Sequence, residues 1–139
     1  LGGSYYSLHI GHLSDGAKGK LTFGDGDTLY FVSRSLNIKS WNPLLWEVFI
    51  NIGTNRVDNK INVALEIIHE DFSSKFHICS QQITLDSTSN KTYKIECPGG
   101  EIGNLSTDDM LQLKIWGVGP TSQYTLYVDQ STRIQILYM

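Results

Sequence analysis

The chain has few charged residues and few cysteines, and it lacks both a basic run and a long apolar run. Only 18% of its 139 residues are Asp, Glu, Lys or Arg, and the formal net charge is −3. Proteins that bind nucleic acid carry clustered Lys and Arg, and a membrane-spanning helix needs ~18 consecutive apolar residues. We therefore expect no nucleic-acid partner and no membrane span.

The sequence also lacks the short motifs of common enzyme classes. It contains no GxSxG, HExxH or phosphate-loop pattern, and each of these patterns marks a particular catalytic chemistry. The four His residues are not spaced as a metal-binding set. We predict a protein that is not an enzyme and that needs no cofactor.

The acidic residues offer candidate ligands for one ion, calcium. Asp25 and Asp27 lie in the glycine-punctuated segment GDGD, and Asp108 and Asp109 lie in the segment STDDM. Carboxylates in short loops are the ligands that Ca²⁺ prefers. The same residues make ordinary tight turns without an ion, which is the interpretation we favour, and calcium stays open as the alternative.

Apolar and polar residues alternate along most of the chain with a period of two, which is typical of strands that bury one face. Turn-forming segments rich in Gly, Asn, Asp and Pro separate the alternating stretches. The predicted strands span residues 4–10, 20–24, 28–38, 45–52, 61–70, 76–85, 91–97, 110–116, 123–129 and 132–138. Many short strands without crossover helices predict an all-β protein, a single antiparallel β-sandwich of the jelly-roll or Ig-like kind.

The two cysteines flank a predicted turn at STSN. If Asp86 pairs with Asn90 in a hairpin, Cys79 falls opposite Cys97, and the apolar residues of both strands share one face. Opposite cysteines on one face lie within disulfide reach. We predict a Cys79–Cys97 disulfide, with two buried free thiols as the alternative. A disulfide indicates an oxidising compartment, so we predict a secreted, extracellular or cell-surface protein.

Two further features suit an extracellular protein. Asn90 and Asn104 begin N-x-Thr and N-x-Ser sequons in predicted turns, which makes them candidate glycosylation sites. Trp41 and Trp116 are candidates for stacking on sugar rings, because an exposed aromatic face packs well against the C–H bonds of a sugar. The alternative for both Trp residues is that they cover the ends or edges of the sandwich.

The N-terminal segment SYYSLHI predicts a strand between the flexible segments LGG and GHLSDGAKG. The chain begins with Leu1 rather than Met, and we expect a mature terminus exposed by signal cleavage. Residues 1–19 are interpreted as strand and connector, and residues 20–139 as the sandwich domain. The strand could complete its own sheet, or Tyr6, Leu8 and Ile10 could enter the open sheet of a neighbouring copy.

With these features the chain resembles secreted prokaryotic, archaeal-type β-sandwich subunits of donor-strand filaments, the threads and TasA-like bundling pili. The resemblance implies an extracellular structural subunit that polymerises by β-strand donation, with other copies of itself as partners. Two alternatives stay open. One is a secreted carbohydrate-binding or adhesion module with glycan partners, and the other is a viral or appendage jelly-roll structural protein.

Overall fold

The computed structural model describes residues 3–7, 19–128 and 132–138, which form ten strands and no helix. Each strand lies within a few residues of a predicted one. The strands are β1 (Gly3–Ser7), β2 (Lys20–Gly24), β3 (Thr28–Val32), β4 (Leu45–Thr54), β5 (Lys60–Ile68), β6 (Ser74–Thr84), β7 (Lys91–Pro98), β8 (Met110–Val118), β9 (Gln123–Tyr127) and β10 (Arg133–Leu137). Within these residues there is no apolar helix of membrane-spanning length.

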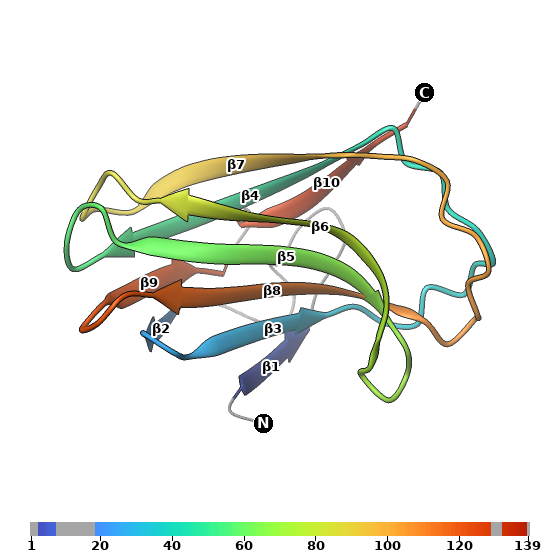
Figure 1. Cartoon of the computed structure of the whole chain (residues 1–139), viewed down its shortest axis with the longest axis horizontal. Helices are drawn as coiled ribbons and strands as arrows, with labels where there is room; N and C mark the ends of the chain where they lie inside the picture. Colours follow the sequence, from blue (N-terminus) through green and yellow to red (C-terminus); the bar gives the residue numbers. More distant parts are fainter. Residues whose placement is uncertain (1–2, 8–18, 129–131, 139) are drawn as a thin grey trace.

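The strands form two packed sheets with jelly-roll topology (Figure 1). Sheet A has the order β1-β3-β8-β5-β6, and sheet B has the order β7-β4-β9-β2, with β10 pairing the first half of β4. From β2 to β9 the chain changes sheet at every step except between β5 and β6, which are neighbours in sheet A, as in a double Greek key. The predicted all-β sandwich is confirmed, and the topology selects the jelly roll over the Ig-like arrangement.

The core lies between the two sheets and contains the apolar side of each alternating strand. Phe31, Ile50, Leu65 and Leu113 are at most 1% exposed. Every residue of β8 from Leu111 to Ile115 follows the expected alternation except the nearly buried Gln112. Burial of each such side chain contributes roughly 1.5–3 kcal/mol, so the sandwich is held mainly by these contacts between sheets.

The predicted disulfide is present, but the predicted hairpin around it is wrong. Cys79 and Cys97 are bonded, with their Cα atoms 6.1 Å apart. Cys79 lies on β6, which pairs with β5 in sheet A, whereas Cys97 lies on β7, which pairs with β4 in sheet B. The two strands are neighbouring edges of different sheets (Figure 1). The bond therefore joins the two sheets across the core at one edge of the sandwich.

The N-terminal strand lies on its own domain in this structure. β1 pairs in parallel with β3 at the other edge of sheet A, with Tyr6 opposite Phe31. It is the one parallel pairing among the described strands. Leu8 and Ile10, the other predicted donor residues, lie outside the described residues, as does most of the 1–19 segment. Donation of this strand to another copy stays a prediction.

Candidate functional site

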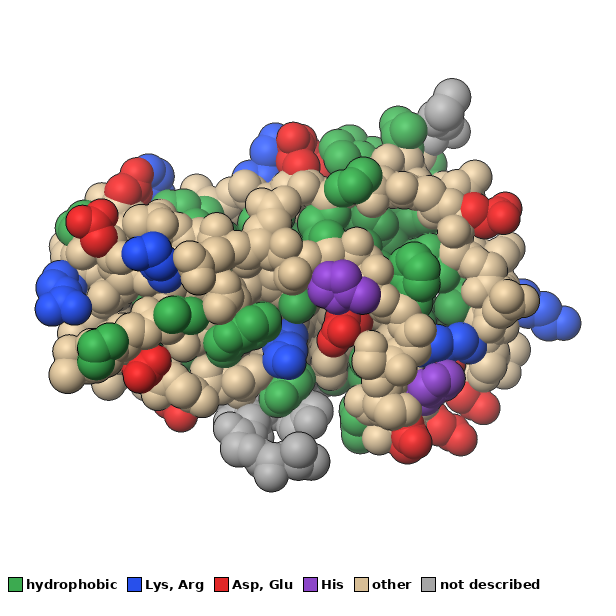
Figure 2. Space-filling view, in the orientation of Figure 1, with side chains coloured by type: hydrophobic (Ala, Val, Ile, Leu, Met, Phe, Trp, Pro, Cys, Tyr) green, Lys and Arg blue, Asp and Glu red, His purple; other side chains and the backbone are tan. Residues whose placement is uncertain are grey.

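The outer face of sheet A brings together aromatic and amide side chains from four strands. The register places Trp116 of β8 between Thr28 of β3 and Asn62 of β5, and Asn62 lies opposite Gln82 of β6. Trp116 is half-buried and points away from the core, as its position between buried neighbours predicts. Figure 2 views the molecule from this side and shows a surface made mostly of uncharged polar side chains and backbone, with scattered charged side chains and with apolar side chains that gather in its upper right part.

A shallow trough of about 250 Å³ lies beside the Trp116 indole. Asn62, Ser80, Gln81 and Gln82 line it together with Trp116. The Nε2 of Gln82 donates a hydrogen bond to the Oδ1 of Asn62 at 3.2 Å. Each side-chain amide offers two donor hydrogens and an acceptor oxygen. The trough thus combines one flat apolar wall with a floor that can both donate and accept hydrogen bonds.

Lys114 lies on the other side of Trp116 and is held by aromatic rings. Its Nζ is 5.0 Å from the centroid of the Trp116 ring and 5.8 Å from that of Tyr30. Across the β8–β5 pairing, Lys114 faces Ala64, the smallest side chain of this surface. Both distances lie within the ~6 Å range of cation–π attraction. The ammonium is therefore held over the Trp116 ring, which also lines the trough.

A contact between a histidine and a carboxylate lies on the same face, further along the strands. The Nδ1 of His77 is 3.6 Å from the Oε2 of Glu66, which also accepts a hydrogen bond from the Ser74 hydroxyl at 3.1 Å. Glu66 is thus engaged by two neighbours of β6. It lies two positions from Ala64 and four from Asn62 on β5, so it does not line the trough.

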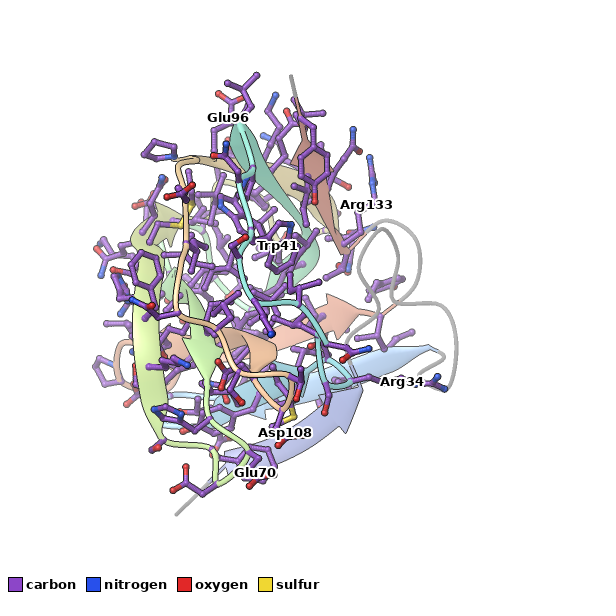
Figure 3. The ribbon with its side chains drawn as sticks, turned by 90° about the vertical axis from the view of Figure 1, so that its right-hand side faces the viewer. Arg34, Trp41, Glu70, Glu96, Asp108 and Arg133 are labelled. Carbon is purple, nitrogen blue, oxygen red and sulfur yellow. A yellow bond between two sulfur atoms is a disulfide. The ribbon has the colours of Figure 1, made fainter. Side chains whose placement is uncertain are left out.

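Trp41, the other predicted stacking residue, is half-buried at one end of the sandwich. Its indole packs edge-on against Trp46 with ring centroids 5.0 Å apart, and its Nε1 donates a hydrogen bond to the Tyr138 hydroxyl at 2.6 Å. Its backbone pairs with Ile102. Figure 3 looks onto this end and shows Trp41 inside the outline of the two sheets. These contacts give Trp41 a role in closing the sandwich, which is the alternative left open from the sequence.

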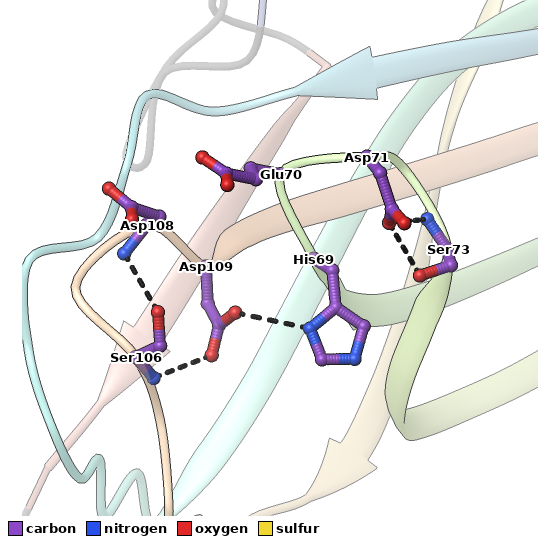
Figure 4. A pocket seen from close by; sticks show the side chains of 7 residues that line it. All are labelled: His69, Glu70, Asp71, Ser73, Ser106, Asp108 and Asp109. Atoms are coloured by element: carbon purple, nitrogen blue, oxygen red, sulfur yellow. Dashed lines mark hydrogen bonds and ion pairs between the residues drawn. The ribbon is translucent and has the colours of Figure 1, made fainter.

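A pocket at the same end contains one of the predicted calcium pairs (Figure 4). His69, Glu70, Asp71, Ser73, Ser106, Asp108 and Asp109 line it, and its volume is about 480 Å³. Asp109 is almost fully buried and is bound by protein groups, not by a second carboxylate. Its Oδ2 accepts hydrogen bonds from the Lys75 ammonium at 2.6 Å and the Ser106 amide at 2.7 Å, and its Oδ1 is 3.7 Å from the His69 Nδ1.

The ionised state of Asp109 is therefore stabilised within the protein. Its burial favours the neutral acid, but the hydrogen bonds from Lys75 and Ser106 and the charges of Lys75 and His69 outweigh burial. Together they hold the pKa of Asp109 below its ordinary value. The Asp109 carboxylate is thus bound by an ammonium and a backbone amide of the protein itself, and these bonds connect β6 to the loop before β8.

The second predicted pair stabilises turns. Asp27 accepts a hydrogen bond from the Gly24 amide at 2.9 Å, and Asp25 accepts one from the Gly119 amide at 3.0 Å. Among the described residues no group of three or more His, Cys, Asp or Glu side chains is arranged to hold a metal ion. The turn interpretation accounts for both carboxylates.

The two sequon residues have different surroundings. Asn104 is exposed, with a positive φ of 59° in the loop after β7. Asn90 is half-buried, and its Nδ2 donates to the Asn51 Oδ1 at 3.3 Å and to the Thr125 carbonyl at 3.5 Å. A glycan on the Asn90 nitrogen would replace one of its two hydrogens and so disrupt at least one of these contacts. Asn104 is the more accessible of the two predicted sites.

Comparisons with known proteins agree on the fold. No family model matches the chain, and neither does any curated protein sequence. Among solved structures, a CocE/NonD family hydrolase from Staphylococcus aureus aligns with 94% of this chain at a TM-score of 0.69 and 7% identity. The chain spans only 34% of that hydrolase.

Two other solved structures are covered over most of their length. A carbohydrate-binding module specific for non-crystalline cellulose, CBM28, aligns at a TM-score of 0.55 and 12% identity, covering 88% of this chain and 76% of the module. A putative sugar-binding protein from Bacteroides thetaiotaomicron aligns at a TM-score of 0.50 and 6% identity, covering 96% of this chain and 93% of that protein. At these identities the comparisons establish a shared β-sandwich fold.

Sequence reasoning found Trp116 but missed the residues around it. Asn62, Gln82, Lys114 and Tyr30 come from four strands, and the pairing of those strands decides which side chains meet. Period-two alternation does indicate that each of them points outward. Their proximity follows only from the order β3-β8-β5-β6.

Proposed function

We propose that this chain is a carbohydrate-binding module that holds a glycan against the outer face of sheet A. The observation that carries the proposal is the trough beside Trp116, with amides on its floor. The flat indole suits the C–H face of a sugar ring, and Asn62 and Gln82 suit its hydroxyl groups, which both donate and accept hydrogen bonds.

Binding without catalysis is part of the proposal. None of the residues lining the trough is a carboxylate, His or Cys, whereas glycoside hydrolysis normally uses a pair of Asp or Glu residues. The solved structures covered over most of their length are a carbohydrate-binding module and a putative sugar-binding protein. That similarity in fold supports the proposal, as does the outward position of Trp116.

We also propose that the protein works outside the cytoplasm. The Cys79–Cys97 bond joins the two sheets, and structural disulfides persist in oxidising compartments. Extracellular polysaccharides and surface glycans are found in the same compartments. A location outside the cytoplasm and a glycan ligand are therefore consistent with each other.

The test is binding of the whole chain to a glycan array, followed by titration calorimetry with the best ligand. We expect Trp116→Ala to weaken binding at least tenfold, which corresponds to about 1.4 kcal/mol. Tyr127→Ala is the matched control, because Tyr127 is a half-buried aromatic residue on the outer face of sheet B. Equal loss in both variants, or full binding by Trp116→Ala, would contradict the proposed site.

A further inference from the structure

The lysine beside the trough differs in its partners from three other lysines of the sandwich. Lys75, Lys91 and Lys94 each form an ion pair with a carboxylate. Within the described part of the chain, no carboxylate lies within 4.0 Å of the Lys114 ammonium. Its contacts are with the rings of Trp116 and Tyr30. The charge is thus held in place without being neutralised.

Two aromatic rings fix the position of this charge relative to the trough. Rings attract an ammonium through their faces, but they accept no conventional hydrogen bonds from it, so its N–H groups stay available to a ligand. Trp116 contacts Lys114 and also lines the trough. A sugar lying against the indole would therefore have the ammonium at its edge.

A second lysine lies on β5, a strand that lines the trough. Lys60 lies two positions before Asn62 on β5, so both side chains point to the same face, and Lys60 has no ion pair among the described residues. Glu66, the acidic residue of this face on β5, lies four positions from Asn62, and its Oε2 is 3.6 Å from the Nδ1 of His77. Lys60 and Lys114 thus place two cationic side chains on this face of a chain whose formal net charge is −3.

We propose that the ligand is an anionic polysaccharide, carboxylated or sulfated, whose acid group is bound by Lys114 while its ring stacks on Trp116. The inference rests on the proposed function and specifies its ligand class. A neutral glycan would leave the ammonium without an anionic partner. An acidic sugar would complete its coordination by a charge-assisted hydrogen bond.

The experiment compares polymers that share a backbone and differ in charge. Polygalacturonate is measured against its fully methyl-esterified form, and dextran sulfate against dextran, by calorimetry with the whole chain. We expect the charged member of at least one pair to bind at least tenfold more tightly, with affinity falling as NaCl is raised. The pair that shows the difference identifies the acid group as carboxylate or sulfate.

Three variants assign the preference to one lysine. Lys114→Gln should abolish the preference, and Lys114→Arg should retain it within about threefold. Lys20→Gln is the matched control, because it removes the same charge from a lysine over an aromatic ring, Tyr127, on sheet B. It should leave the preference unchanged.

The outcomes separate this inference from the proposed function. No preference for either charged polymer, or a preference that survives Lys114→Gln, overturns the inference. An equal loss in Lys20→Gln also overturns it, because net charge would then be the cause. If neutral glycans bind and Trp116→Ala removes that binding, the proposed function stands while the anionic ligand is rejected.

Discussion

The disulfide between the two sheets should account for a large share of the stability of the sandwich. Cys79 and Cys97 are 18 positions apart in the sequence and join β6 of sheet A to β7 of sheet B. Replacing both by Ala removes the cross-link, and the small change in side-chain volume leaves the other core residues in place. This double substitution therefore tests the disulfide bond and not the packing around it.

The expected loss follows from the length of the closed loop. For a loop of 18 residues, restriction of the unfolded chain contributes about 3 kcal/mol at 25 °C. A domain of 139 residues has an unfolding entropy near 0.3 kcal/mol per kelvin, so Tm should fall by about 10 °C. Because the bond joins sheets that already pack on a common core, the variant should still fold.

Urea denaturation and calorimetry of the oxidised chain, the reduced chain and Cys79→Ala/Cys97→Ala measure this loss. The reduced chain and the double variant should lose similar stability, and a reducing agent should leave the double variant unchanged. A loss below about 1 kcal/mol in the double variant would refute the reasoning from loop closure. A variant that does not fold at all would show that the bond also determines how the sheets pack.

Two further predictions concern side chains at the loop end of the sandwich. Asp109→Asn should lower the free energy of unfolding by about 2 kcal/mol at neutral pH, because charged hydrogen bonds from Lys75 and Ser106 are lost. The pKa of Asp109 is lowered in the folded chain. The stabilisation by its carboxylate should therefore be complete above about pH 4 and disappear as the pH falls below that. Urea titrations of both proteins at several pH values would contradict this if the difference in stability between wild type and Asp109→Asn persists at pH 2. Trp41→Ala should lower stability by about 2 kcal/mol through lost packing while leaving glycan affinity unchanged. Normal stability with lost binding would instead place the site at Trp41.

Much of the fold could be predicted from local pattern alone. Alternation identified every described strand and placed Leu111, Leu113 and Ile115 inside and Trp116 outside, as observed. The predicted strand over 28–38 is shorter in the structure and ends at Val32. Beyond it the chain leaves the sheet, and its backbone bonds to the loop before β8, as in the hydrogen bond from Leu36 to Asp109.

The error in the cysteine hairpin has a geometric cause. Strands that are neighbours in one sheet and strands that face each other across a sandwich both point their apolar residues to the same core. Ile83, Leu85, Tyr93 and Ile95 are therefore sorted correctly under either arrangement. Residue pattern determines the face of a strand but not its hydrogen-bonded partner, so the disulfide was predicted and its place between sheets was not.

The candidate site could be predicted only in part, because residue pattern does not determine which strands pair. Trp116 was identified because its own strand alternates, whereas its neighbours are set by long-range pairing. Tyr30 lies opposite Lys114 only because β3 pairs with β8, which lies about 80 residues further along the chain. Contacts of that kind leave no trace in a single sequence.

The strand order described above also bears on how the chain reaches its native state. Among the described strands only β5 and β6 pair as neighbours in sequence, across the turn at residues 69–73. Every other pairing must close a longer loop before it gains any contacts, and folds of this kind assemble slowly, over milliseconds to seconds. We therefore expect the β5–β6 hairpin to form early, with the thiols oxidising only after β7 has docked on β4.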